Sequence, residues 1–416
     1  MQLQPQAEPT QTATLTTPKK YLPEAIKKIV KETQNTQIQS AKIEYKTTLS
    51  EHFKTLADPR KIGMVSHQLI DIITIAVCAI ICGAEDWVGV ETFGKAKQHW
   101  FSQFLELSNG IPSHDTFNSV FNCLSAKELQ KCFASWMHDI FKLTDNEVVA
   151  IDGKCLRHSY DRKSGKAAIH MVSAWAHNNR LVLGQVKTDD KSNEITAIPE
   201  LLKLLDIRGC IVTIDAMGCQ RSIASEIINR GGDYVLALKG NQGHLHQAVK
   251  AYFEAAVAEN FDTIEHDFYQ TTDGDHGRIE TRQYWTIDNL EWLENKENWT
   301  GLTSIGMVKR TREIEDKITT EISFYITSLK SDAKRFGDAV RAHWGIENSL
   351  HWSLDVTFNE DHARIRKGEG AENFAVLRHI ALNLLKQEKS QKVGIANKRL
   401  KAASDEDYLF NVLSLQ

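Results

Sequence analysis

Two aspartates each close a short apolar run of the chain. Asp152 ends the run 148–152, and Asp215 ends the run 210–215. Because open α/β sheets place their ligands beyond the carboxyl ends of the strands, an acid at each of two strand ends indicates a site there. If the strands are neighbours, the two carboxylates repel each other unless one is protonated or a cation lies between them. Either aspartate alone is equally well explained by a turn or a helix cap.

A third carboxylate, Glu347, lies in a predicted helix with His343 and His351 four residues to either side. This spacing places the three side chains on one stripe of the helix. In one interpretation Glu347 completes the site while the histidines orient it or contact phosphate. In the others the three residues bind zinc or form a polar seam between helices. Zinc is the least favoured, because ligands spread over two turns of a straight helix cannot all reach one ion.

Carboxylate oxygens without soft ligands nearby favour Mg²⁺ or Mn²⁺. Two such ions about 4 Å apart would activate a water or a 3′-hydroxyl and stabilise the leaving oxygen in an in-line phosphoryl displacement. That chemistry cuts and joins DNA. We therefore expect Asp152, Asp215 and Glu347 to be catalytic and to hold two divalent ions, and we expect no small-molecule cofactor.

The elements that must position these acids follow from hydrophobic periodicity. After residue 144 the order is three strands, a helix, a strand, a helix and a strand, at 148–152, 170–176, 181–186, 194–205, 210–215, 220–229 and 234–238. This order predicts an α/β fold with a ribonuclease H-like mixed sheet core, in a catalytic domain spanning 145–390. A β-rich insertion interrupts it at about 244–330, and two helices follow, from 332 and at about 371–387.

An all-helical N-terminal domain is predicted for residues 46–142. Within it Ser113 suits the N-cap of a helix whose apolar residues recur at helical spacing, from Phe117 to Leu124. The polar face of this helix indicates either a DNA-reading helix-turn-helix or an ordinary surface helix. We expect residues 1–45 to be a disordered tail with a helix at about 22–34, and residues 391–416 to be a basic tail.

The composition of the chain argues against several classes of protein. The chain has 416 residues and a net charge of -4, so a basic surface requires uneven charge, as in the runs 157–166, 309–312, 364–367 and 386–401. Seven cysteines without a Cys-x-x-Cys pair argue against disulfide or thiolate-zinc frameworks. The longest apolar stretch, 72–84, is too short to span a membrane. A cytoplasmic protein without a membrane partner is expected.

Several longer motifs carry a family resemblance. They are 57–60 (ADPR), 111–117 (IPSHDTF), 151–154 (IDGK), 213–216 (TIDA), 237–242 (ALKGNQ), 276–280 (HGRIE) and 343–348 (HWGIEN). With these motifs the chain resembles the DDE transposases of bacterial insertion sequences, in the branch of the H-repeat-associated proteins. The resemblance covers nearly all of 49–387.

The resemblance implies cleavage of DNA strands at the ends of the element and strand transfer that uses Mg²⁺. It also implies that Asp152, Asp215 and Glu347 are the first, second and third acids of the catalytic motif. A broader group surrounds the glutamate with Tyr-x2-Arg-x3-Glu-x6-Lys. This chain departs from that pattern, with Val340, His343 and Leu354 at the other three positions. Candidate DNA contacts are therefore the following residues: Lys154, Lys239, Asn241, Gln242, Arg278, Arg282, Arg341, His343 and His351. Trp285, Trp292 and Trp299 are interpreted either as stacking platforms for a flipped base or as core residues.

Three functions remain open at this point. The first is an active transposase acting on terminal inverted repeats and target DNA, which requires at least a homodimer on DNA. The second is a catalytically silent, transposase-derived DNA-binding protein. The third is a metal-dependent nuclease without strand transfer.

Overall fold

The computed structural model describes residues 51–414, apart from 62, 64, 141–144, 161–164, 166, 189–193, 276 and 316. The expected tail 1–45 and its helix lie outside the described residues. Among those described, no helix is long and apolar enough to cross a membrane.

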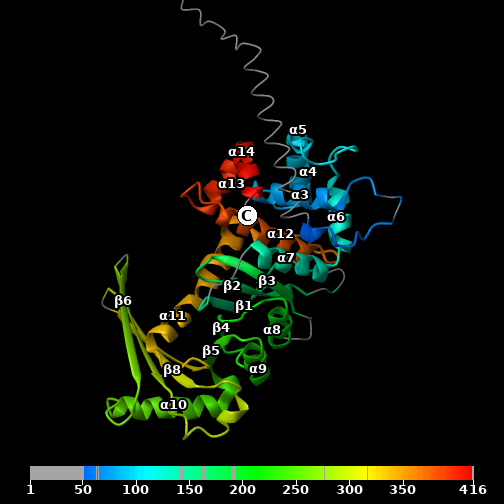
Figure 1. The fold of residues 1–416 in the computed structure, drawn as a ribbon. Helices are drawn as coiled ribbons and strands as arrows, with labels where there is room; N and C mark the ends of the chain where they lie inside the picture. The colour runs from blue at the N-terminus through cyan, green and yellow to red at the C-terminus, as the bar shows by residue number, and fades with distance from the viewer. Residues whose placement is uncertain are drawn as a thin grey trace, which may run out of the picture. The chain divides into compact units, whose positions relative to one another are not determined.

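A nine-stranded mixed sheet runs through the protein in the order β3-β2-β1-β4-β5-β9-β8-β7-β6 (Figure 1). Its strands are β1 (Val148–Leu156), β2 (Ile169–Ala176), β3 (Leu181–Lys187), β4 (Ile211–Ile214), β5 (Asp233–Leu238), β6 (Asp267–Asp275), β7 (Arg278–Ile287), β8 (Ser304–Ile314) and β9 (Lys317–Thr327). Strands β1, β4 and β5 are parallel, and every other pairing is antiparallel. The strands β6 to β9 of the expected β-rich insertion therefore continue the same sheet, because β9 pairs directly with β5.

Helices cover both faces of the sheet. One face packs on α8 (Glu194–Lys203), α9 (Arg221–Asn229) and α10 (Gly243–Ala258) through one hydrophobic cluster. The opposite face packs on α11 (Ala333–His343) through residues such as Phe336 and Val340. Because side chains alternate along a strand, Asp152 projects to the same side as Val148 and Ala150, which is the side of α11. The candidate site thus lies on that face.

The segment after α11 departs from regular α-helix. Two π-helical turns, η4 (Ile346–His351) and η5 (Ser353–Thr357), follow it, and then comes the short 3₁₀ helix η6 (Glu360–His362). Two other 3₁₀ helices are η2 (Gly240–Gln242) and η3 (Lys296–Asn298). π-helical turns are uncommon and occur often at functional sites.

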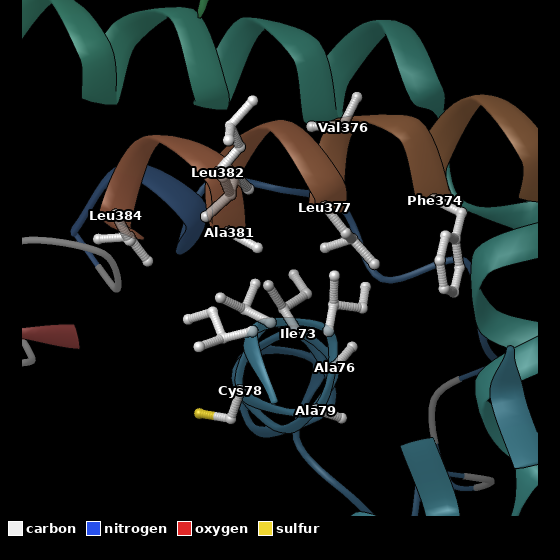
Figure 2. Packing of buried hydrophobic residues seen from close by; sticks show 14 of the residues in the cluster. Ile73, Ala76, Cys78, Ala79, Phe374, Val376, Leu377, Ala381, Leu382 and Leu384 are labelled. Carbon is white, nitrogen blue, oxygen red and sulfur yellow. The ribbon is translucent and has the colours of Figure 1, made fainter. Parts of the chain in front are cut away.

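The N-terminal helices do not close a core by themselves. They are α2 (Glu51–Phe53), α3 (Leu69–Ile81), α4 (Trp87–Ala96), α5 (Gln98–Phe101), α6 (His114–Cys123) and α7 (Ala126–Ile140). Their hydrophobic core is completed by α12 (Gly370–Gln387), from the far end of the chain. Figure 2 shows Ile73 and Ala76 of α3 beneath Leu377 and Ala381 of α12. Residues 51–140 and 370–413 therefore fold around one core.

The predicted N-cap of α6 is confirmed, since the Ser113 side chain accepts a hydrogen bond from the Thr116 backbone N–H. In place of the basic tail expected at 391–416, the chain forms α13 (Ile395–Ser404) and α14 (Glu406–Leu413). Lys398 and Arg399 from its basic run are buried there. The reason is that backbone carbonyls accept from both: Lys398 from Leu385 and Glu388, and Arg399 from Ile80 and Ile81.

Candidate active site

Asp152 and Asp215 lie at matching positions of two neighbouring parallel strands. Ile151 of β1 pairs with Ile214 of β4, and each aspartate is the next residue. One expectation was wrong in detail: β1 does not end at Asp152 but runs on to Leu156, because its pairing with β2 continues after β4 has stopped. Asp215 does follow the end of its strand, where its Oδ1 accepts hydrogen bonds from the backbone N–H groups of Met217 and Gly218.

The charges of the predicted acids act on one another. Burial raises the pKa of Asp152 to about 7, and the negative charges of Glu194, Asp215 and Glu347 raise it as well. Two half-buried aspartates thus lie on the α11 side of the sheet, with the exposed Glu347 on the segment that follows α11. Such a set repels itself, and a divalent cation would relieve that repulsion.

Unlike the two aspartates, Glu347 is exposed. It lies on the first π-helical turn, η4. The straight helical stripe predicted for His343, Glu347 and His351 is absent, because α11 ends at His343 and the wider π-turn changes the angle between successive residues. His343 and His351 point to the strands while Glu347 faces a groove.

The two histidines are neutral groups packed against the aspartates. His343 Nδ1 lies 3.1 Å from the Thr213 hydroxyl, and burial lowers the His343 pKa. His351 Nδ1 lies 3.7 Å from Asp152 Oδ2, and burial lowers the His351 pKa to about 4. Neutral imidazoles of this kind position a carboxylate more readily than they attract a phosphate.

Glu194 is a neighbour of the site that the sequence did not reveal. It begins α8 and accepts a hydrogen bond from His170 Nε2 at 2.7 Å. A Cβ at Gly153 would overlap both the Glu194 carboxylate and the His170 ring. The glycine of the 151–154 motif therefore makes room for this pair on the α8 side of β1, opposite to the side that carries the Asp152 carboxylate, and that Asp-Gly dipeptide was the only available signal.

Lys154 is not placed to contact DNA. Its ammonium lies 2.6 Å from Asp355, 2.9 Å from Glu360 and 3.5 Å from Asp361, and its side chain is nearly buried. Glu360 is fully buried and also pairs with Arg378 of α12 at 3.6 Å. This network joins β1 to the segment that follows the π-helical turns.

The motif after β5 supports the loop that follows Asp215. The Asn241 amide donates to the Ala216 carbonyl at 2.5 Å, and the Gln242 amide donates to the Cys219 carbonyl at 2.9 Å. Both amides, predicted as DNA contacts, are thus used within the protein. Lys239 before them is exposed.

The three remaining predicted contacts line one groove. Arg278, Arg282 and Arg341 surround a space of about 1060 Å³ that Glu347 also lines. The tryptophans of the strand-rich region are elsewhere in the core: Trp299 is buried, Trp292 stacks on Tyr252, and Trp285 stacks on Phe261.

The donor set suits a hard divalent ion, since it consists of carboxylates and neutral imidazoles and includes no thiolate. Within the described part of the chain, however, no three His, Cys, Asp or Glu side chains stand close enough together to hold a metal ion. Exposed Glu347 on its π-helical turn is the member that would have to approach the aspartates.

Comparison with known proteins places these residues in a family. The "Transposase DDE domain" profile matches residues 143–384, and the profile of its associated domain matches 50–137. The H repeat-associated candidate transposase YhhI of Escherichia coli (strain K12) is 44% identical over 371 residues, which is 88% of this chain and 97% of that protein.

Two further similarities concern a shorter relative and a solved structure. The inactive transposase YbfQ of Escherichia coli (strain K12) is 40% identical over 72 residues, covering 17% of this chain and 86% of YbfQ. A cryo-EM structure of a piggyBac transposase synaptic complex with hairpin DNA aligns at 13% identity and a TM-score of 0.40, covering 90% of this chain and 77% of that one. That likeness is too weak to support a conclusion. The profile match over most of the chain and the identity with YhhI show that this protein belongs to the DDE transposase family, in the H-repeat-associated branch.

Proposed function

We propose that this protein is an active transposase that cleaves DNA at insertion-sequence ends and joins the ends to target DNA. The observation that carries the proposal is the pairing of β1 with β4, which puts Asp152 and Asp215 at matching strand positions, and Glu347 is near enough for its charge to help raise the Asp152 pKa. The order and pairing of β1 to β5 support a ribonuclease H-like core within a catalytic domain at 145–390.

In this proposal Asp152, Asp215 and Glu347 hold two Mg²⁺ or Mn²⁺ ions. Such ions would activate the attacking oxygen and stabilise the leaving one. The protein's own contribution is positioning. Backbone N–H groups of Met217 and Gly218 fix the Asp215 carboxylate, and the neutral His351 imidazole lies against Asp152. Because both histidines stay uncharged, they add no positive charge that would compete with a cation for the carboxylates.

DNA is the substrate in this proposal, as terminal inverted repeats and as target. Joining two ends requires at least two active sites, so a homodimer on DNA is part of it. The groove beside Glu347 carries cationic side chains that suit phosphate, among them Arg278 and Arg341.

The catalytically silent alternative has one observation in its favour, since a relative of this chain is named an inactive transposase. That relative matches only 72 residues, however. The nuclease alternative has the same acids and differs only in lacking strand transfer.

One assay separates the three. Purified protein is incubated with Mg²⁺, a target plasmid and labelled DNA carrying the inverted repeats that flank its gene. Labelled ends covalently joined to plasmid indicate a transposase. Nicking without joined product indicates a nuclease, and a shifted but intact substrate indicates a silent DNA-binding protein. Either of the last two results would overturn the proposal.

A further inference from the structure

The pairing of β7 with β8 concentrates arginines on one face of the sheet. Arg282 lies directly opposite Arg310, and Glu280 lies directly opposite Arg312. Like charges directly opposite each other in a sheet are destabilising. A fold that keeps such an arrangement needs compensating negative charge, and Glu280 is the carboxylate that contacts both arginines.

Glu280 is buried, with 4% of its surface exposed, and four guanidinium groups surround it. The Arg282 group is 2.9 Å away, the Arg310 group 3.4 Å, and the groups of Arg278 and Arg312 3.7 Å. Arg278 and Arg312 are about half exposed, so their guanidiniums have free edges. Arg282 also pairs with Asp273 at 2.6 Å, and Arg310 with Glu321 at 3.5 Å. Glu280 is thus the common partner of a fan of four guanidinium groups, and the positive charges outnumber the carboxylates that pair with them.

The fan faces the groove that leads to Glu347. Seven residues lining this groove are cationic and four are acidic, so its lining has a net charge of +3 although the whole chain is negative. Arg341 of α11 adds a fifth guanidinium, tied to β6 by an ion pair with Asp273 at 2.8 Å. A local excess of guanidinium groups with bidentate geometry suits phosphate oxygens.

An exposed tryptophan stands at the end of the groove beside Glu347. Trp344 lines the groove with 41% of its surface exposed, three residues before that glutamate. The Arg310 guanidinium carbon lies 5.4 Å from the centre of its ring. A cationic groove with an exposed aromatic ring is the combination that binds single-stranded nucleic acid, because the ring stacks on an unpaired base while the cations follow the backbone.

We propose that this groove binds one unpaired DNA strand, with backbone phosphates on the arginine fan and a base stacked on Trp344 beside Glu347. In this arrangement Glu280 is a positioning residue: it aims the guanidiniums and does not touch the DNA. The inference rests on the proposed function, since it takes DNA as the substrate and Glu347 as part of the active site.

The test measures binding of a fluorescently labelled 12-nucleotide oligo(dT) to the full chain in EDTA, across a salt series and beside a duplex of the same length. Trp344→Leu should weaken oligo(dT) binding at least about fivefold, the low end for one stacked base, and leave duplex binding unchanged. Trp344→Phe should restore it. Because Trp344 is exposed, these variants keep the fold.

Glu280→Gln distinguishes guanidinium groups that Glu280 holds in place from a cationic surface that acts through its total charge alone. The variant raises the net charge by one, so a diffuse cationic surface would bind oligo(dT) more tightly and with a steeper salt dependence. The fan predicts weaker binding and a shallower salt dependence, because guanidiniums that lose their common partner no longer converge on phosphate. Glu200→Gln, which raises the net charge by the same amount at an exposed glutamate outside the groove, is the matched control and should change little.

Tighter binding by Glu280→Gln, or unchanged oligo(dT) binding by Trp344→Leu, would overturn the inference. Neither result depends on cleavage. A protein that nicks and joins terminal-repeat DNA but gives these results would refute the inference alone, whereas binding as predicted in a protein that never nicks would refute only the proposed function.

Discussion

Asp152 and Asp215 follow two residues that face each other across parallel strands, Ile151 of β1 and Ile214 of β4. The register alone brings these acids together, so their proximity depends on the sheet and not on flexible loops. Glu347 is exposed and comes from the π-helical turn after α11, so the strand register does not fix its distance to the aspartates.

Gly153→Ala tests the room left for Glu194 and His170. The added methyl group overlaps both side chains, so their hydrogen bond should break and the β1 backbone that carries Asp152 should shift. DNA nicking should slow at least about tenfold, since small misplacements of reacting groups are costly. Gly274→Ala, where a Cβ meets nothing within 4 Å, is the control. Equal nicking by both variants would show that the pair is not part of the site.

Glu360→Gln tests the buried network behind β1. Removing this carboxylate leaves Lys154 and Arg378 without their shared partner, and breaking a buried pair costs about 3–5 kcal/mol. Urea denaturation measures the loss, and the double variant with Lys154→Met should be less destabilised than the sum of the two single variants. In the exposed pair Lys203–Glu200, Glu200→Gln should cost less than about 1 kcal/mol. Simple additivity at Glu360 and Lys154 would contradict the network.

Asp71→Asn tests a buried carboxyl near the start of α3. Burial, helped by the charge of Glu106, raises the Asp71 pKa from 3.8 to about 6, and 5% of the residue is exposed. A carboxyl whose pKa is raised by folding does not lower the free energy of unfolding below about pH 4, where it is protonated in both states. As the pH rises from about 4 to 6 the free energy of unfolding falls, and above pH 6 the loss stays constant.

The asparagine variant should therefore be more stable than wild type at pH 8, by at most about 3 kcal/mol, with the gain vanishing near pH 4. Thermal unfolding across this pH range measures it. A gain that is the same at both pH values would mean that ionisation of Asp71 is not its cause.

Arg399→Met tests whether the C-terminal segment belongs to the core. Its guanidinium donates to carbonyls at the end of α3, from Ile80 and Ile81, and to the carbonyl of Thr357. Leaving these groups unpaired should lower the free energy of unfolding by about 2–4 kcal/mol. Arg208→Met, at an exposed position, should change it by less than about 0.5 kcal/mol. A free basic tail at 391–416 would instead give two equal, small effects.

Local patterns in the sequence predicted most elements of the sheet and little of its assembly. The apolar runs before Asp152 and Asp215 found β1 and β4, because strands covered on both faces are continuously hydrophobic. They did not show that β1 continues past Asp152, since the apolar run stops there and residues 152–155 are less buried than 148–151. The pairing of β9 with β5 is a contact between distant segments, so alternation alone suggested a separate insertion.

The same limit applies to the site. The acids were found by strand position and family motif, whereas the neutral state of His351 and the approach of Glu194 depend on tertiary packing. The arginine fan depends on register: a shift of one residue between β7 and β8 would turn Arg310 away from Arg282 and Glu280. Basic residues in this region were visible in the sequence, but their common partner was not.

The most direct test of the three-carboxylate site is the single-turnover nicking rate of terminal-repeat DNA in Mg²⁺, measured for wild type, Asp152→Asn, Asp215→Asn and Glu347→Gln. Glu200→Gln, an exposed glutamate outside the site, serves as the matched control. We predict that wild type and Glu200→Gln nick at the same rate and that each of the three site variants is slower by at least about a hundredfold while still binding the DNA. Nicking by Glu347→Gln at the wild-type rate would contradict the site as described.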